Sequence, residues 1–191
     1  MGTAACPPPP THPPRERAGE IARDGGCVDT HGGRAGWGLA FGSAKGQTMA
    51  GPLPGPWQTA QRAEVYAVLM AITMFTGPVS IITDSRYVHD RLARLLKGER
   101  PKGAHEDLWN RITSLLERVS GVSWVKAHLS QGEATRMGIS EGHWRLNQLA
   151  DLAASEGITM HQEDPGYWAL HAFRGRAIRG WQLHLLGIYR M

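Results

Sequence analysis

The run Val79–Ser85 (VSIITDS) constrains the fold of this chain more than any other stretch. Val79, Ile81 and Ile82 are β-branched and suit a buried strand. Asp84 follows where that strand leaves the sheet. Because ligands of open α/β sheets bind at the carboxyl ends of strands, Asp84 is a candidate site residue. An Asp in this position is also a common helix N-cap, and that alternative stays open at this point.

The segment before the first helix reads as a three-stranded antiparallel meander. Glu20–Asp24 is expected to be its first strand, although Ile21 is the only strongly β-forming residue in it. Gly25-Gly26 is expected to turn the backbone. Trp37–Phe41 alternates large and small residues, which indicates a second strand, and Gln47–Ala50 is expected to return as the third.

Helices alternate with two further strands in the rest of the chain. Apolar periodicity predicts helices from Ala60 (capped by Thr59), over Arg86–Leu96, over His105–Val119 and over Trp144–Glu156, a strand over Val122–Ala127, and a polar loop or short helix over 129–143. On the second helix, Leu95 and Leu96 are expected to face inward, and Arg91 outward. The order β-β-β-α-β-α-α-β-α predicts an α/β fold, with a mixed five-stranded sheet flanked by helices, in which the first three strands are antiparallel.

Four carboxylates are expected to meet at one edge of this sheet. Asp24 and Asp84 end adjacent strands, Glu64 lies on the margin of the first helix's apolar stripe, and Asp151 lies one helical turn after Asn147. Such a set repels itself strongly unless divalent cations neutralise it. Oxygen ligands suit Mg²⁺ or Mn²⁺, and two such ions can activate a water and stabilise the leaving oxygen of a phosphodiester.

These features together resemble one family, the type 1 ribonuclease H domains, particularly the branch found in retroelements and associated with reverse transcriptases. The matching residues are Asp24-Gly25-Gly26 with the following AGWGLAF, Gln61-Arg62-Ala63-Glu64, Thr83-Asp84-Ser85, and Val125-Lys126-Ala127-His128 followed by Asn147-Gln148-Leu149-Ala150-Asp151. The resemblance covers about residues 19–157. It implies a ribonuclease H-like domain over 19–157, two Mg²⁺ or Mn²⁺ ions per site, an RNA–DNA hybrid as substrate and a reverse transcriptase domain as a further partner.

The resemblance also implies roles for individual residues. Asp24, Glu64, Asp84 and Asp151 would bind the metal ions, and His128 would be the histidine of a mobile loop that aids proton transfer or product release. Recognition of the 2′-hydroxyl group separates RNA from DNA. The expected substrate contacts are Gly25, Gly26, Gln61, Arg62, Ser85, Arg86 and Asn147, with phosphates also taken by the basic 97–102 loop. For each of these contacts ordinary surface is the alternative, and Glu64 taken alone would equally suit a side chain that extends to solvent or pairs with Arg62 or Arg86.

The two ends of the chain carry its basic excess, within a formal net charge of +4. Residues 1–18 are proline-rich and are expected to be a disordered leader. Residues 158–191 place Trp168 and Trp181 among arginines, and this tail can stack on nucleic acid or form an amphipathic helix. No apolar run approaches the roughly 20 residues of a membrane helix, and no signal peptide is visible, so an intracellular location without a membrane is expected.

Two functions are consistent with these residues. One is a metal-dependent endonuclease that hydrolyses the RNA strand of RNA–DNA hybrids. The other is a catalytically decayed ribonuclease H-like domain that binds nucleic acid or a partner without cutting. The four acids and His128 favour the first function, whereas the weakly β-forming first strand and the unfamiliar ends favour the second.

Overall fold

The computed structural model describes residues 19–28, 33–42, 47–75, 77–100, 102–161 and 165–188, so the predicted leader at 1–18 lies outside the described residues. The strands are β1 (Gly19–Val28), β2 (Arg34–Phe41), β3 (Thr48–Pro52), β4 (Val79–Thr83) and β5 (Val119–Trp124), and the helices are α1 (Ala60–Met74), α2 (Arg86–Leu96), α3 (Glu106–Ser114), α4 (Gln131–Arg136), α5 (Glu141–Thr159) and α6 (Pro165–Ile188). The sheet order is β3-β2-β1-β4-β5, with β1, β2 and β3 antiparallel in turn and with β4 parallel to both β1 and β5. The predicted mixed sheet is therefore confirmed.

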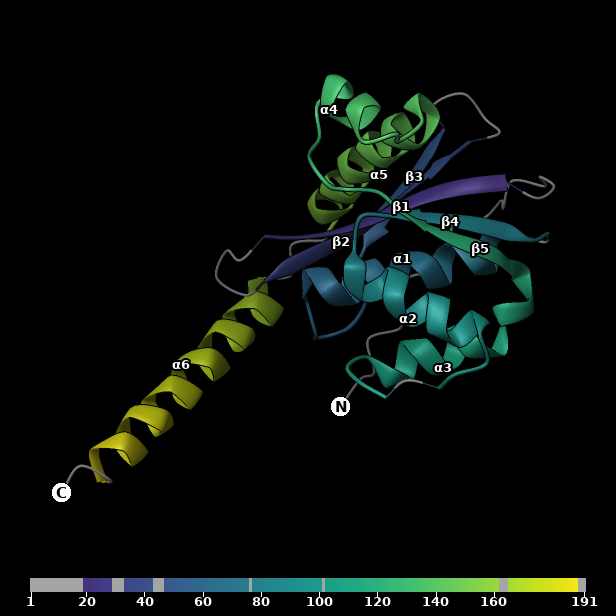
Figure 1. Ribbon diagram of the computed structural model, residues 1–191. Helices are drawn as coiled ribbons and strands as arrows, with labels where there is room; N and C mark the ends of the chain where they lie inside the picture. The colour runs from purple at the N-terminus through teal and green to yellow at the C-terminus, as the bar shows by residue number, and fades with distance from the viewer. Residues whose placement is uncertain are drawn as a thin grey trace.

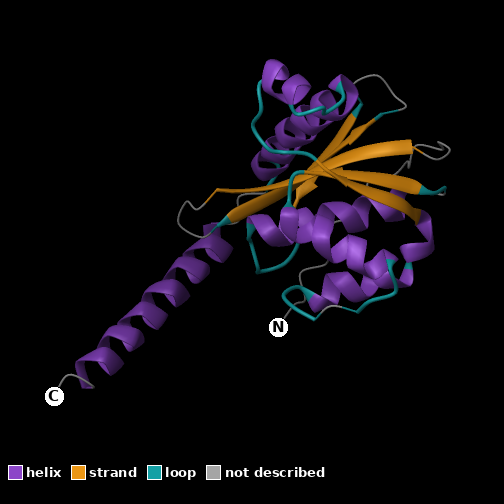
Figure 2. Cartoon of the chain, in the orientation of Figure 1, coloured by secondary structure: helices purple, strands orange, loops and turns teal. Residues whose placement is uncertain are grey.

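Helices cover both faces of the sheet (Figures 1 and 2). The α1, α2 and α3 helices lie on one face, over a large core that includes Ile21, Ile81 and Trp109. The α5 helix covers the other face, over a smaller core that includes Ala22 and Ile82. Consecutive residues of β1 and β4 thus point to opposite cores, as the two-residue period of a strand requires.

The prediction of a turn at Gly25-Gly26 was wrong, because both glycines lie inside β1. Gly25 pairs with Trp37 and Gly26 with Gly36 across the antiparallel ladder. A Cβ atom on Gly25 would lie only 2.2 Å from the backbone nitrogen of Glu64. Because Gly25 has no side chain, α1 can pack directly against β1. This contact fixes the position of Glu64 relative to Asp24.

A second close approach positions α5. Gly38 pairs with Asp24 in the ladder between β1 and β2. A Cβ atom on Gly38 would lie 2.3 Å from the backbone nitrogen of Ala154. The α5 backbone consequently packs directly on the sheet beside Asp24, one turn beyond Asp151 along the helix.

The predicted helix over His105–Val119 was wrong at its C-terminal end. The α3 helix ends at Ser114, a 3₁₀ turn covers Leu116–Arg118, and β5 begins at Val119. Val119 is buried and pairs with Val79 of β4. It therefore belongs to the sheet and not to the helix that the apolar pattern predicted. The strand predicted over Val122–Ala127 accordingly begins and ends three residues earlier.

The predicted faces of α2 also needed correction. Arg91 was expected to face solvent but is only 6% exposed, whereas Leu96, expected to face inward, is 38% exposed. The Arg91 guanidinium lies 5.0 Å from the ring centroid of Trp109, and its Nη2 donates to Glu106 Oε1 at 2.8 Å. An arginine with an aromatic face and a carboxylate as partners can be buried at much lower cost than an unpaired one.

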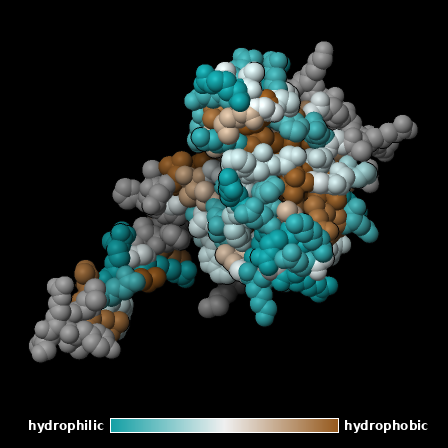
Figure 3. Space-filling model, in the orientation of Figure 1, coloured by the Kyte–Doolittle hydropathy of each residue, from teal (hydrophilic) through white to brown (hydrophobic). Residues whose placement is uncertain are grey.

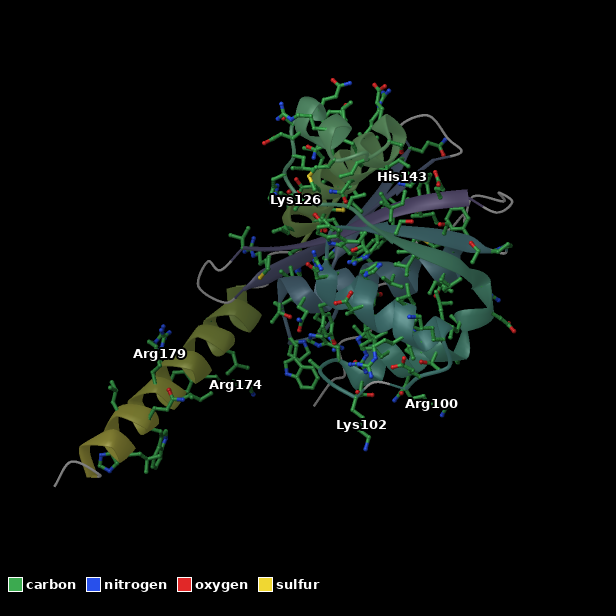
Figure 4. The ribbon with its side chains drawn as sticks, viewed as in Figure 1. Arg100, Lys102, Lys126, His143, Arg174 and Arg179 are labelled. Atoms are coloured by element: carbon green, nitrogen blue, oxygen red, sulfur yellow. The ribbon has the colours of Figure 1, made fainter. Side chains whose placement is uncertain are left out.

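The α6 helix extends away from the sheet and its covering helices (Figure 1). Its side chains mix apolar and polar character along its length (Figure 3), and Phe173 and Trp181 are both exposed. Arg174 and Arg179 project from it into solvent (Figure 4). No helix in the described part of the chain combines the length and the apolar character that crossing a bilayer requires.

Candidate metal and nucleic-acid site

Asp84 directly follows β4, at the carboxyl edge of the parallel strands. The α2 helix begins at Arg86, and its N-cap is Ser85, whose hydroxyl accepts a hydrogen bond from the backbone N–H of Val88. The alternative in which Asp84 caps this helix is therefore wrong. Because Ser85 takes the capping role, the Asp84 carboxylate is left to interact with the groups around the sheet edge.

Trp124 holds the backbone of Asp84 in place. Its indole Nε1 donates to the Asp84 carbonyl oxygen at 2.9 Å, from the position in β5 that pairs with Thr83. The same ring also contacts Arg86, whose guanidinium lies 4.3 Å from the ring centroid. Trp124 was not among the residues predicted for the site. The available signal was its place at the end of the strand next to β4.

Asp24 lies in an environment that opposes its negative charge. Burial, the negative charge of Asp84 and a hydrogen bond shared with Asp151 raise the pKa of Asp24 to about 7. The Gly25 N–H, which donates to Asp24 Oδ1 at 2.7 Å, and the positive charge of Arg23 act in the opposite direction. The structure thus brings together three of the four carboxylates that the sequence singled out.

Glu64 reaches the same site from α1. Its Oε2 accepts a hydrogen bond of 2.5 Å from the Ser85 hydroxyl. Burial raises the pKa of Glu64, the charge of Arg23 and the Ser85 hydrogen bond lower it, and the charge of Asp84 raises it again. The fourth carboxylate is therefore also close enough to Asp84 to interact with it electrostatically.

The alternative that pairs Glu64 with Arg62 or Arg86 was wrong. Arg62 donates to Asp107 Oδ2 at 2.5 Å, and its guanidinium lies 5.3 Å from the ring centroid of Trp57. Arg86 instead lies on Trp124. Glu64 is therefore held by a neutral hydroxyl group, which leaves its charge available to a cation.

Asn147 adds an uncharged oxygen to the site. The residue is only 4% exposed, and its Nδ2 lies 3.5 Å from Asp84 Oδ2. Its Oδ1 is buried and has no hydrogen-bond partner among the described residues. A buried acceptor without a partner is costly, so this position suits a ligand atom that donates a hydrogen bond or carries positive charge.

The side chains fit a divalent cation by their chemistry, although they do not enclose one. Within the described ranges, no three His, Cys, Asp or Glu side chains gather closely enough to hold an ion as they stand. The carboxylates of the site instead make pairwise contacts. Asp24 is hydrogen-bonded to Asp151, and Glu64 is hydrogen-bonded to Ser85. A shared proton relieves repulsion between carboxylates as a cation would, and oxygen donors of this kind suit Mg²⁺ or Mn²⁺.

His128 was expected to be the histidine of a mobile loop that aids proton transfer or product release. It is exposed in the loop between β5 and α4, and its φ of 53° lies in the left-handed region, which strains a residue with a Cβ atom. Among the described side chains, no hydrogen bond joins the His128 ring to any of the four acids. Directly after this loop, a capping box between Ser130 and Glu133 fixes the start of α4.

The predicted substrate contacts divide into buried and exposed groups. Gly25 and Ser85 are buried, Gly26 is half-buried, and Gln61 and Arg86 are exposed beside the site. Farther away, Arg100 and Lys102 project from the loop between α2 and α3 (Figure 4). As contacts to a substrate, all of these residues stay predictions.

Comparison with known proteins adds an independent line of evidence. A protein-family model described as RNase H matches residues 16–159. A ribonuclease H of Paramagnetospirillum magneticum is 30% identical over 159 residues, which covers 76% of this chain and 92% of that relative. The Gag-Pol polyprotein of bovine immunodeficiency virus is 32% identical over 120 residues, 61% of this chain but only 8% of the polyprotein.

Solved structures agree with this match. The PFV RNase H domain superposes with a TM-score of 0.57 at 25% identity, over 74% of this chain and 94% of that domain. A foamy viral protease-reverse transcriptase in complex with an RNA/DNA hybrid gives a TM-score of 0.53 at 22% identity, over 83% of this chain and 22% of that one. The second likeness, at this lower identity, concerns the fold alone.

Proposed function

Because this chain belongs to the ribonuclease H family, we propose that it is a metal-dependent endonuclease that hydrolyses the RNA strand of RNA–DNA hybrids. The observation that carries the proposal is the gathering of Asp24, Asp84 and Asp151, where burial, the charge of Asp84 and a hydrogen bond with Asp151 raise the pKa of Asp24 to about 7. Carboxylates with no catalytic or binding task are seldom buried together, since their repulsion costs stability.

Asp24, Glu64, Asp84 and Asp151 would hold two Mg²⁺ or Mn²⁺ ions. When bound, such ions activate the attacking water and stabilise the leaving oxygen of the phosphodiester. The chain itself orients the ligands. Ser85 fixes the Glu64 carboxylate, Trp124 fixes the backbone of Asp84, and α5 packs closely enough on the sheet to bring Asp151 to Asp24.

Recognition of the hybrid is the second task of this surface. The unpartnered Oδ1 of Asn147 offers an acceptor for the 2′-hydroxyl of the cleaved strand, and that hydroxyl is what separates RNA from DNA. Arg86, held on the Trp124 ring, and the exposed Gln61 offer donors to nearby phosphates. His128 is exposed on its loop and can exchange a proton with the departing product.

A reverse transcriptase domain is the proposed protein partner. The similarity to a viral Gag-Pol polyprotein and to a foamy viral protease-reverse transcriptase supports this association. The α2–α3 loop of this chain carries few basic residues, Arg100 and Lys102 among them, so a neighbouring domain would add contacts to the hybrid.

The second candidate function is hybrid binding without cleavage. Two features favour it, namely the pairwise contacts of the carboxylates, which do not enclose an ion as they stand, and the fully buried arginine at position 23, next to Asp24. This candidate makes a different prediction from the first, because binding would then be independent of Mg²⁺ and no product would form.

The deciding experiment incubates the purified chain with labelled RNA–DNA hybrid, duplex RNA and duplex DNA, with and without Mg²⁺ or Mn²⁺. We expect cleavage of the hybrid alone, only with metal, and an Asp84→Asn variant slower by about a thousandfold, since several kcal/mol of transition-state stabilisation depend on the metal site. Asp90→Asn, on the exposed surface of α2, is the matched control and should cleave normally. Hybrid binding without metal-dependent cleavage would overturn the proposal in favour of the second candidate.

A Trp124→Phe variant tests how the Asp84 backbone is held. Phenylalanine keeps a ring beneath Arg86 but removes the indole N–H, so we expect about 1 kcal/mol less stability in urea unfolding and about a tenfold fall in the rate of hybrid cleavage. Trp109→Phe is the control, since its indole Nε1 donates to the Tyr87 hydroxyl at 3.1 Å, away from the acids. It should lose comparable stability without the fall in rate, and equal rates in both variants would contradict the role of Trp124.

A further inference from the structure

Arg23 is a fully buried cation next to a proposed metal ligand. It has 0% exposure and precedes Asp24 in β1. Because strand residues alternate, its side chain lies on the α1 face of the sheet, whereas the Asp24 side chain reaches Asp151 on the α5 face. Arg23 was not among the residues predicted for the site.

The guanidinium group joins the two elements that carry Glu64 and Asp84. Its Nη1 donates to the backbone carbonyl of Glu64 at 3.0 Å, and its Nη2 donates to the Thr83 hydroxyl oxygen. The same hydroxyl oxygen accepts the Ser85 N–H at 2.9 Å, and the Ser85 hydroxyl donates to the Glu64 carboxylate at 2.5 Å. Arg23 thus closes a ring of hydrogen bonds beneath the site, from β1 to α1 and to the end of β4.

Within the described part of the chain, no anion is hydrogen-bonded directly to Arg23. Both of its hydrogen-bond acceptors are neutral, and its Nε has no partner among the described residues. Burial lowers the pKa of Arg23, whereas the nearby charges of Glu64, Asp24 and Asp84 raise it. A buried charge is retained at considerable cost, and here its electrostatic partners are the acids of the site.

We infer that Arg23 supplies a buried positive charge to the carboxylate site, so that the site binds divalent cations more weakly than it would with a neutral residue at this position. The inference rests on the proposed function, because it takes the four acids to be the cation ligands. Its physical basis is the repulsion between a guanidinium and a divalent ion that share the same carboxylates at close range.

The test measures Mn²⁺ binding to the full chain by titration calorimetry, without substrate. We expect Arg23→Met, which keeps an unbranched apolar side chain, to lower the Kd for Mn²⁺ by about tenfold or more. Arg23→Gln, which is neutral but can still donate to Thr83 or Glu64, should show the same direction of change. Arg23→Lys retains the charge and should bind Mn²⁺ within about threefold of the wild-type chain.

The affinities for Mn²⁺ distinguish an electrostatic role of Arg23 from a structural one. A merely structural role would lower the melting temperature in all three variants and leave the affinity for Mn²⁺ unchanged or weakened, and this would overturn the inference. If hybrid cleavage by the wild-type chain is intact in that case, the proposed function still stands. Loss of Mn²⁺ binding on adding Asp84→Asn to Arg23→Met is expected, and it would locate the ion at the carboxylates. Mn²⁺ binding that survives the added substitution would overturn the inference.

Discussion

Gly25→Ala is expected to lower the free energy of unfolding by about 4 kcal/mol and to abolish hybrid cleavage. The added Cβ atom would lie 2.2 Å from the Glu64 nitrogen and 2.5 Å from the Ala63 carbonyl carbon. Both are backbone atoms, so the overlap is relieved only by moving the start of α1 away from β1. That movement also displaces Glu64 from the other carboxylates. Urea unfolding followed by circular dichroism measures the first effect.

Gly26→Ala is the matched control for this substitution, one residue further along the same strand. Its Cβ atom would lie 3.0 Å from Cδ1 of Ile158, the far end of a flexible side chain. We expect a loss of about 1 kcal/mol or less in the free energy of unfolding, because a side chain can move where a backbone cannot. An equal loss of stability in the two variants would contradict the close-packing role assigned to Gly25.

The predictions of element boundaries from sequence were most accurate around Asp84. The β-branched run over Val79–Thr83 and the apolar stripe of α2 are local patterns, and both elements appear with the predicted boundaries. Local pattern also placed the Thr59 cap, whose side chain accepts from the Arg62 N–H. Sequence periodicity is sufficient where the burial of one face decides the structure.

The first strand shows where local pattern fails. Its β propensity is low, yet β1 extends from Gly19 to Val28 because β2 pairs along one side of it and β4 along the other. The two glycines were predicted to form a turn because glycine occurs both in turns and where a helix packs closely on a strand. A single sequence does not distinguish these two cases. Pairing with distant strands, rather than propensity, therefore determines this central strand.

Long-range side-chain contacts account for the remaining differences within the site. Arg62 and Arg86 were both considered as partners of Glu64, but Arg62 bonds Asp107, 45 residues away in the sequence, and Arg86 lies on the ring of Trp124. The four acids could be predicted from the sequence because they occur in a fixed order relative to the predicted strands and helices. The hydrogen bonds that orient them arise only in the folded chain.

The raised pKa of Asp24 predicts a specific dependence of stability on pH in buffer without divalent ions. The folded-state pKa is about 7, against an ordinary value of 3.8. Between these values the unfolded chain has lost this proton while the folded chain retains it. The contribution of Asp24 is therefore fully present below about pH 4, falls as the pH rises toward 7, and stays low above that.

Asp24→Asn removes this titration while keeping the shape of the side chain. We expect the free energy of unfolding of the variant, relative to that of the wild-type chain, to rise by about 3 kcal/mol between pH 4 and pH 7, since each pKa unit corresponds to about 1.4 kcal/mol. Urea unfolding at closely spaced pH values measures the difference, with Asp90→Asn as the control for the substitution itself. A difference that is constant across this range would contradict the raised pKa of Asp24. Saturating Mg²⁺ should reduce the pH-dependent difference, because a cation bound by the carboxylates stabilises the deprotonated form of Asp24.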